Sequence, residues 1–335
     1  MVEAPPPDIG NRLELLRRYF SIWEIPRVEE RTINAPHRAG KSPGPRNKEG
    51  YRSDSFHVRL AFNIAYLGCS WTEGMGLPRG KIFPDLVASE LREISGISVA
   101  TWNCGLASTG MDFAVRLTPS ICNSLRPDLI VLVLPGADRR EFFSEAGHRL
   151  NYVSGRPTVL ANSGGFYDST VNAFNVLTND YDNTAHLLKS FRAFEAMVRS
   201  SGTPWVYSWT SNPQSDELMA QLIHEGYLPK DAYLGQPFAR VDYVSESDRH
   251  PGHESHEVFA KAIVGWIIDR GFANIGDRAA QPGSGIPNSS SRHEHLEPHA
   301  MSRIWNRLFG RPDAHRVPRA TQTKARAGDD FYPLW

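Results

Sequence analysis

The chain lacks an excess of charge of either sign. Lys and Arg together number 37, Asp and Glu together also number 37, and the formal net charge is zero. Such a balance provides no strong field to attract a nucleic acid or an anionic membrane surface. The sequence also contains no run of the roughly 20 apolar residues that a membrane-spanning helix needs. We therefore expect neither a nucleic acid partner nor a membrane span.

Cysteine is scarce as well. The chain has three, Cys69, Cys104 and Cys122, at uneven intervals. So few cysteines fit a reducing compartment better than a disulfide framework. Residues 1–10 contain three consecutive prolines and lack the basic stretch and apolar stretch of a secretory signal. These features predict a cytoplasmic protein.

The composition changes along the chain and divides it into three zones. Residues 1–57 form an N-terminal extension rich in proline and arginine, and residues 58–272 carry the regular apolar patterns. From 273 to 335, glycine, proline, serine, arginine and histidine dominate, which predicts a disordered tail. Within this tail, residues 301–309 have apolar side chains at helical spacing and predict a short amphipathic helix.

The middle zone alternates short apolar runs with helix-length stretches. In the runs, apolar residues do not alternate with polar ones, so each run predicts a strand buried on both faces. This alternation predicts βαβ units, a parallel sheet and helices on both of its faces. Ligands of such sheets bind beyond the carboxyl ends of the strands. The predicted strands are 60–67, 97–102, 129–134 and 205–209, and the predicted helices are 83–94, 111–125, 185–199, 215–224 and 255–268.

A serine follows the first predicted strand within a glycine-rich segment, Gly-Cys-Ser-Trp-Thr-Glu-Gly-Met-Gly, at 68–76. Glycines allow a sharp turn that would present Ser70 to a ligand. The segment lacks the lysine of a phosphate-binding loop. It also has Thr72 where the elbow of α/β-hydrolases has its second glycine. Two interpretations remain open here: Ser70 is a nucleophile, or it caps the next helix.

Two later segments carry matching chemistry. After the second strand, Gly105 places a backbone N–H where it can stabilise an oxyanion. Ser108 or Thr109 of the same segment is expected to cap the following helix. Near the end of the α/β zone, Asp248 and His250 stand two residues apart, so in extended chain both point to the same side. There the carboxylate can orient the imidazole as a general base.

These segments resemble the sequence blocks of SGNH/GDSL hydrolases over residues 47–270. "IAYLGCSWTEGMGL" resembles the first block, "NCGLASTG" the second and "SDRHPGHESHEVFAKAI" the last, in the family's order. Upstream, "NKEGYRSDSF" resembles a phrase that precedes the first block in some members. The resemblance implies a three-layer α/β/α, flavodoxin-like fold with a mostly parallel five-stranded sheet. It implies Ser70 as nucleophile, His250 as base and Asp248 as its partner. The Ser70 and Gly105 N–H groups would hold the oxyanion, with no metal or organic cofactor.

The chain departs from the family pattern at two points. The last pair is spaced Asp-x-His, where the family commonly has Asp-x-x-His. The third block usually supplies an asparagine that donates to the oxyanion, but this chain has no asparagine at 134–139. Loss of one such donor costs about 3–4 kcal/mol of transition-state stabilisation in other enzymes. Asn162 and Asn172 are candidate replacements.

Other interpretations concern metal, charge and aromatic residues. His250, His253 and His256 stand three residues apart, as in a zinc site, but Pro251 and Gly252 interrupt the helix that would align them. The tail histidines, His293, His295 and His299, are expected to be solvated. Arg139 and Arg140 follow a strand and either contact an anionic substrate group or are surface residues that open a helix. The tryptophans at strand ends form either a substrate wall or core: Trp71, Trp102 and Trp209.

Three functions follow from this pattern. The first is hydrolysis of a small-molecule carboxylic ester, such as an O-acetylated carbohydrate, a short-chain ester or a lipid ester, through an acyl-enzyme. The second is an acyltransferase that uses the same triad with an alcohol in place of water. The third is a module that binds a ligand without turning it over.

Overall fold

The computed structural model describes residues 20–23, 45–143, 149–153 and 176–272. Contacts divide the chain into two units, Met1–Ile286 and Pro287–Trp335. The second unit lies outside the described residues, as do the predicted tail and its helix at 301–309.

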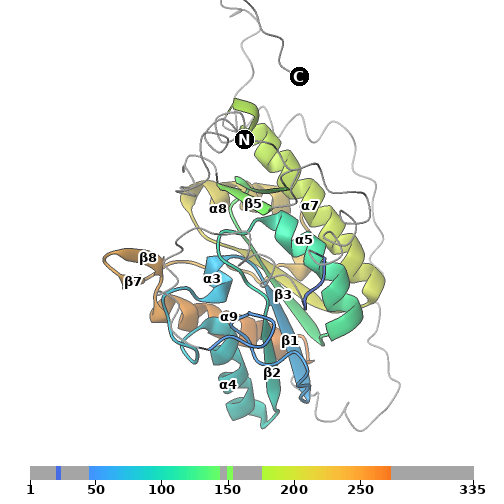
Figure 1. Cartoon of the computed structure of the whole chain (residues 1–335), viewed down its shortest axis with the longest axis vertical. Helices are drawn as coiled ribbons and strands as arrows, with labels where there is room; N and C mark the ends of the chain where they lie inside the picture. Colours follow the sequence, from blue (N-terminus) through green and yellow to red (C-terminus); the bar gives the residue numbers. More distant parts are fainter. Residues whose placement is uncertain (1–19, 24–44, 144–148, 154–175, 273–335) are drawn as a thin grey trace, which may run out of the picture. The chain divides into compact units, whose positions relative to one another are not determined.

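The first unit is built on a parallel sheet (Figure 1). Its strands are β1 (Phe62–Leu67), β2 (Val99–Asn103), β3 (Leu129–Leu134) and β6 (Trp205–Trp209). They lie in the order β2-β1-β3-β6, and all three pairings are parallel. Every residue of these strands is buried, as expected for a sheet covered on both faces. The α/β class predicted from the sequence is confirmed.

The sheet differs from the prediction in its fifth strand. Among the described residues it has four full strands, and two isolated parallel bridges occupy the position beyond β6. These bridges join Tyr207 to Tyr233 and Thr210 to Phe238. Leu234 N–H and Phe238 N–H also donate to carbonyls of β6. Gly235, with φ of 98°, and Pro237 interrupt this segment, so it follows the sheet edge without forming a continuous ladder.

Helices cover both faces of the sheet. On one face lie α4 (Phe83–Ser95) and α9 (His253–Asp269), whose buried residues share a core with Ile64, Val131 and Val206. On the other face lie α5 (Met111–Ser120), α7 (Asp180–Ser201) and α8 (Pro213–His224). The three-layer arrangement follows from this division.

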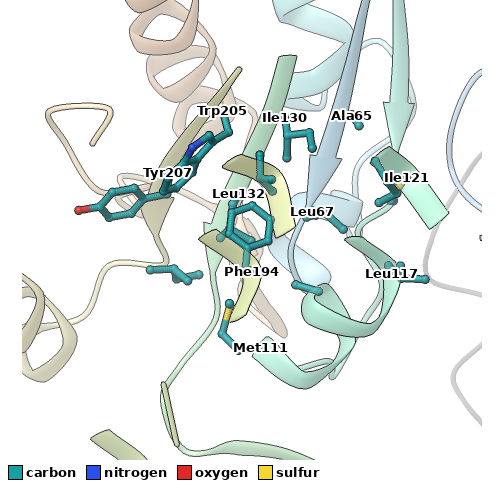
Figure 2. Packing of buried hydrophobic residues seen from close by; sticks show 14 of the residues in the cluster. Ala65, Leu67, Met111, Leu117, Ile121, Ile130, Leu132, Phe194, Trp205 and Tyr207 are labelled. Carbon is teal, nitrogen blue, oxygen red and sulfur yellow. The ribbon is translucent and has the colours of Figure 1, made fainter. Parts of the chain in front are cut away.

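Alternate residues of each strand supply the two cores. Figure 2 shows Leu67, Ile130, Leu132 and Trp205 of the sheet and Phe194 of α7 in the core shared with α5 and α7. Because successive strand side chains point to opposite faces, an uninterrupted apolar run fills both cores at once.

The helix boundaries follow local sequence signals. Asn179 and Asn212 cap α7 and α8, each accepting a hydrogen bond from a first-turn N–H. Gly96 and Gly202 end α4 and α7 in the left-handed conformation. No helix among the described residues is both long enough and apolar enough to pass through a membrane.

The remaining described residues include two antiparallel hairpins and three short helical turns. Strand β4 (Arg139–Phe143) pairs with β5 (Arg149–Val153), and β7 (Tyr243–Ser245) pairs with β8 (Asp248–Pro251). The helical turns are α3 (Ser70–Glu73) and η2 (Lys230–Ala232), and a π-helical turn, η1 (Ile121–Leu125), extends α5.

Part of the predicted N-terminal extension packs into this body. Tyr51 and Arg52 are fully buried and Phe56 is 3% exposed. Asn47 fixes the turn that precedes them, because its side-chain oxygen accepts from Glu49 N–H and Tyr51 N–H. Residues 45–57 therefore belong to the body structurally.

Candidate active site

Ser70 lies at the start of α3, directly beyond the carboxyl end of β1. Gly68 makes this turn possible, because it has φ of 158° and lies close to its neighbours. A Cβ at Gly68 would lie 2.1 Å from Thr72 Oγ1 and 2.9 Å from the Val133 carbonyl oxygen. The chain can therefore double back from β1 into α3 only with glycine at this position.

The structure brings the three predicted triad residues together although 180 positions separate Ser70 from His250. His250 Nε2 lies 3.1 Å from Ser70 Oγ, and His250 Nδ1 lies 2.6 Å from Asp248 Oδ1. This geometry fits a Nδ1–H that donates to the carboxylate and a Nε2 that accepts from the serine hydroxyl. The result is an unbroken hydrogen-bonded chain of serine, histidine and aspartate.

The hydrogen-bonded side chains of Ser70, His250 and Asp248 are partly exposed, so a ligand can reach them. The side chains of His250 and Asp248 are 29% and 14% exposed, while Ser70 is 6% exposed. Asp248 also accepts from the His250 backbone N–H at 3.2 Å, so one carboxylate fixes both backbone and ring.

The hairpin β7–β8 that carries Asp248 and His250 is anchored to α9. Asp242 accepts hydrogen bonds from Glu254 N–H, Ser255 N–H and Ser255 Oγ at the start of that helix. Burial opposes ionisation of this carboxyl, but the hydrogen bonds from Ser255 and Glu254 prevail and lower its pKa. A charged Asp242 thus stabilises the helix and fixes the entry to the hairpin.

Gly105 packs directly against α3. A Cβ at this position would lie 2.7 Å from Glu73 N and 2.8 Å from Thr72 Cβ, so the close approach requires glycine. Its N–H donates to Asn103 Oδ1 at 3.0 Å, and Asn103 Nδ2 donates to the Thr72 carbonyl at 2.9 Å. The oxyanion role of Gly105 stays a prediction, and in this structure its N–H already has a buried acceptor.

Ser108 differs from its neighbours in this loop. The N–H groups of Leu106, Ala107 and Thr109 donate to the Gly68 carbonyl, Glu73 Oε2 and the Leu106 carbonyl. Within the described part of the chain, the Ser108 N–H has no such acceptor. Ser108 also has φ of 63°, a left-handed conformation that is uncommon outside glycine and often occurs at functional sites.

The helix-capping role expected of Ser108 or Thr109 is wrong. The residue at the N-cap of α5 is Gly110, and it makes no side-chain capping hydrogen bond. Thr109 Oγ1 instead donates to the Leu106 carbonyl at 2.7 Å, within the loop itself.

Two buried charged residues that the sequence did not single out hold the nucleophile turn. Arg52 donates to the carbonyls of Glu73, Gly74 and Leu77. Burial lowers the pKa of its guanidinium, and the nearby Glu73 carboxylate opposes this shift. Glu73, 2% exposed, pairs with Arg46 at 2.7 Å and accepts from Ala107 N–H at 2.8 Å. Arg52 lies in the phrase that begins at Asn47, and Glu73 lies in the glycine-rich segment at 68–76.

The three histidines considered for zinc have separate partners. His250 belongs to the hydrogen-bonded chain, His253 Nδ1 lies 3.3 Å from the Lys81 carbonyl oxygen, and buried His256 accepts from Phe83 N–H. Among the residues that the structure describes, no group of three His, Cys, Asp or Glu side chains is arranged to hold a metal. His293, His295, His299, Asn162 and Asn172 lie outside the described residues.

The two arginines and the three tryptophans considered for substrate contact differ in their environments. Arg140 is buried and bonded to Asp182 and Asn183, which makes it a structural residue. Arg139 donates to the Thr109 carbonyl beside the Gly105 loop. Trp102 is fully buried and Trp209 is 4% exposed, so both are core residues. Trp71 is half-buried immediately after Ser70.

Comparisons with known proteins return matches among solved structures alone. No family model and no curated protein matches the chain. Similar structures include a lipolytic protein of the G-D-S-L family from Desulfitobacterium hafniense DCB-2, at 12% identity and TM-score 0.35, covering 61% of this chain and 98% of that one. A family two carbohydrate esterase from Cellvibrio japonicus has 13% identity and TM-score 0.37, covering 65% and 63%. The lipase Lip_vut3 from a goat rumen metagenome has 12% identity and TM-score 0.37, covering 61% and 96%.

Proposed function

We propose that the protein is a serine esterase that hydrolyses carboxylic esters with Ser70 as nucleophile, His250 as general base and Asp248 as the residue that orients His250. The observation that carries this proposal is the hydrogen-bonded chain of 3.1 Å and 2.6 Å from Ser70 Oγ through His250 to Asp248. A serine hydroxyl is a weak nucleophile unless a base accepts its proton, and His250 Nε2 occupies that position.

The reaction proceeds in two steps. Ser70 Oγ attacks the ester carbonyl carbon as its proton passes to His250 Nε2, and Asp248 stabilises the resulting imidazolium. The tetrahedral intermediate then collapses, the alcohol leaves with the proton from His250, and the acyl group remains on Ser70. Water, deprotonated by His250, attacks the acyl-enzyme and releases the carboxylic acid with Ser70 regenerated.

The oxyanion needs donors at the mouth of the sheet. We assign this role to the N–H groups of Ser70 and Ser108. Ser70 N–H lies at the start of α3, where no intrahelical acceptor exists for it. Ser108 N–H is the loop amide without an acceptor in the described structure, whereas the amide of Gly105 is bonded to Asn103.

A fluorophosphonate probe tests the nucleophile. Such a probe phosphonylates an activated serine, so we expect one adduct per chain, on the peptide that contains Ser70. Ser70→Ala should abolish the adduct, while the matched variant Ser247→Ala, next to Asp248 in the sequence, should be labelled normally. A folded protein that takes no label would favour the ligand-binding module. Label on another serine would show that the triad is misassigned.

Turnover in the presence of an added alcohol separates the two covalent activities. With 4-nitrophenyl acetate as donor, an esterase gives acetate as its main product even with added glycerol. If most of the acyl group appears on glycerol, the protein is an acyltransferase and the hydrolytic proposal fails.

The oxyanion donors can be identified by amide NMR of the phosphonylated protein. The phosphonyl oxygen occupies the oxyanion position and should move the ¹H resonances of its donors downfield. We expect the largest shifts at Ser70 and Ser108, with Gly105 changing little because its N–H stays on Asn103. A dominant shift at Gly105 would instead support the donor inferred from the sequence.

A further inference from the structure

Two exposed arginines lie on aromatic rings beside the candidate triad. The group, here called the arginine–aromatic stack, comprises Trp71, Arg240, Tyr243 and Arg249. The Arg240 guanidinium carbon lies 5.7 Å from the centre of the Trp71 ring and 5.0 Å from that of Tyr243. The Arg249 guanidinium carbon lies 5.9 Å from the centre of the same Tyr243 ring. Both distances to Tyr243 are within the range of cation–π attraction.

The stack is joined to both elements that carry the triad. Trp71 is the residue after Ser70, and its ring packs edge-on against buried Phe238 at 5.3 Å. Arg249 lies between Asp248 and His250 on β8, and its carbonyl accepts from Arg240 Nη1 at 2.9 Å. The position of the two guanidinium groups is therefore linked to that of the reacting serine and histidine.

The charges of Arg240 and Arg249 are not neutralised by the described residues. Neither arginine forms an ion pair with a carboxylate there. The two nearest carboxylates in the hairpin sequence have other partners, since Asp242 is bonded to the start of α9 and Asp248 to His250. A guanidinium has five N–H donors, and Arg240 uses one of them on the Arg249 carbonyl.

This arrangement disfavours one substrate contact and favours another. A sugar ring stacks on an open aromatic face, but arginine side chains lie over the Trp71 and Tyr243 rings. Arg240 and Arg249 are exposed together with Tyr243, and guanidinium groups bind planar carboxylates and phosphates with paired hydrogen bonds.

We propose that the arginine–aromatic stack is a substrate subsite for an anionic group, so that the preferred substrates are esters bearing a carboxylate or phosphate near the scissile bond. This inference rests on the proposed esterase activity. The subsite binds the anion through Arg240, with Arg249 adding a second positive charge, and the rings of Trp71 and Tyr243 hold the guanidinium groups in place.

Matched pairs of neutral and anionic esters test the subsite. For an anion on the leaving group, 4-acetoxybenzoate is compared with its methyl ester. For an anion on the acyl group, mono-4-nitrophenyl terephthalate is compared with its methyl ester. We expect kcat/KM for the anionic member of at least one pair to exceed that of the neutral member by about tenfold, the low end for a hydrogen bond to a charged group.

Three variants assign that preference to the stack. Arg240→Gln should reduce the anionic-to-neutral ratio to about two, and Arg240→Lys should retain part of it because charge remains without the planar fork. Arg92→Gln removes an exposed positive charge from the last turn of α4 and should leave the ratio unchanged. Raising the KCl concentration from 0.05 to 0.5 M should also lower the wild-type ratio by screening.

The outcomes separate this inference from the activity on which it rests. Ser70-dependent turnover of the neutral esters with no anionic preference in either pair would overturn the subsite and leave the esterase intact. An anionic preference that persists in Arg240→Gln would also overturn it. Absence of turnover with every ester would refute the proposed function itself.

Discussion

At the scale of single residues, Asp248 holds His250 by two hydrogen bonds. Its Oδ1 accepts from the ring at 2.6 Å and from the backbone N–H at 3.2 Å. The second contact fixes the turn of β8, and the first fixes the tautomer in which Nε2 faces Ser70. Orientation of the ring and stabilisation of its charged form therefore depend on the same oxygen atom.

Replacement of Asp248 by asparagine keeps the size of the side chain and removes its charge. An amide can donate to Nδ1 and leave the proton on Nε2, where it blocks the base. We expect kcat to fall on the order of 10⁴-fold, as in serine proteases, with KM changed far less. Steady-state kinetics on 4-nitrophenyl acetate checks this, with Glu246→Gln in the same hairpin as the control. A loss below tenfold would mean that other groups orient His250.

His256 lies six residues from His250 and has a different role. It is fully buried, stacks on Phe83 at 5.8 Å, and accepts from the Phe83 N–H at 3.0 Å. Burial lowers its pKa to about 3, while the negative charge of Asp242 acts in the opposite direction. The folded protein therefore holds a neutral imidazole at a position where a charged one would be costly.

The low pKa of His256 should make the protein sensitive to acid. As pH falls from 6.5 toward 3, the unfolded chain binds a proton that the folded chain excludes, so stability decreases across this window. Each pH unit costs up to about 1.4 kcal/mol, or roughly 2 kcal/mol between pH 6.5 and 5. Urea unfolding at pH 7.5 and 5.0 should show a smaller decrease in His256→Gln than in wild type. The half-exposed His253→Gln should retain the wild-type decrease, and equal decreases in all three proteins would contradict this account.

At the scale of elements, the nucleophile turn depends on Arg52. Its guanidinium donates to three carbonyls of the segment that follows Ser70, and it is 1% exposed. The Glu73 carbonyl lies at the end of α3 and the Gly74 and Leu77 carbonyls lie beyond it, where the Gly74 carbonyl also accepts from Leu77 N–H. The planar guanidinium of Arg52 therefore supplies hydrogen-bond donors to backbone carbonyls at and beyond the end of this short helix.

Removal of this guanidinium should both destabilise the fold and slow the reaction. Arg52→Met fills a similar space and removes the guanidinium hydrogen bonds to three carbonyls, of which the Gly74 carbonyl keeps the Leu77 N–H as a donor. We expect a loss of roughly 3 kcal/mol in the free energy of unfolding, at the level of about 1 kcal/mol for each carbonyl. Arg52→Lys should recover part of the stability and of the fluorophosphonate labelling rate. Arg92→Met, exposed on α4, serves as the control, and equal stability of the two Met variants would contradict the role of Arg52.

Strands β1, β3 and β6 were predictable because each is a short, mostly apolar run rich in β-branched or aromatic residues, without the alternation of a half-exposed strand. The hairpin of Arg139–Phe143 with Arg149–Val153 was not, because its strands are short and Arg140 and Glu141 interrupt any alternation. The prediction of a fifth strand was wrong for a different reason, because a glycine and a proline interrupt the edge segment between Tyr233 and Phe238.

In the candidate site too, residues in short motifs could be predicted from the sequence, whereas residues whose role depends on contacts between distant segments could not. Ser70, Asp248 and His250 could be found because each stands at the end of a strand or in a short motif. Glu73 and Arg52 could not, because a buried charge is tolerated only where its partners converge in space. The conformation of Ser108 also depends on how its loop packs against α3. The sequence of the loop alone does not show that packing.

At the scale of the whole molecule, the described residues of the body end at Phe272. The buried residues described in both cores run from Ile22 to Ile267, and the candidate triad ends at His250. Phe272 is the last described residue, and its ring lies 6.2 Å from Phe62 and 5.9 Å from Trp266. This ring covers the end of α9 where the helix meets the sheet.

Two truncations that differ by three residues test where the folding unit ends. A chain of residues 1–272 keeps every contact of the described cores, so we expect it to melt within about 3 °C of the full chain and to label at Ser70 at the same rate. A chain of residues 1–269 loses Phe272, a half-buried aromatic worth about 1–2 kcal/mol, together with the exposed hydrogen bond from Arg270 to the Asp231 carbonyl. At this domain size that loss lowers the melting temperature by roughly 3–6 °C. Differential scanning calorimetry of both truncated chains and the full chain measures these melting temperatures. If 1–272 melts far below the full chain, residues 273–335 contribute to the core. If the two truncations melt together, the Phe272 ring does not stabilise the end of α9.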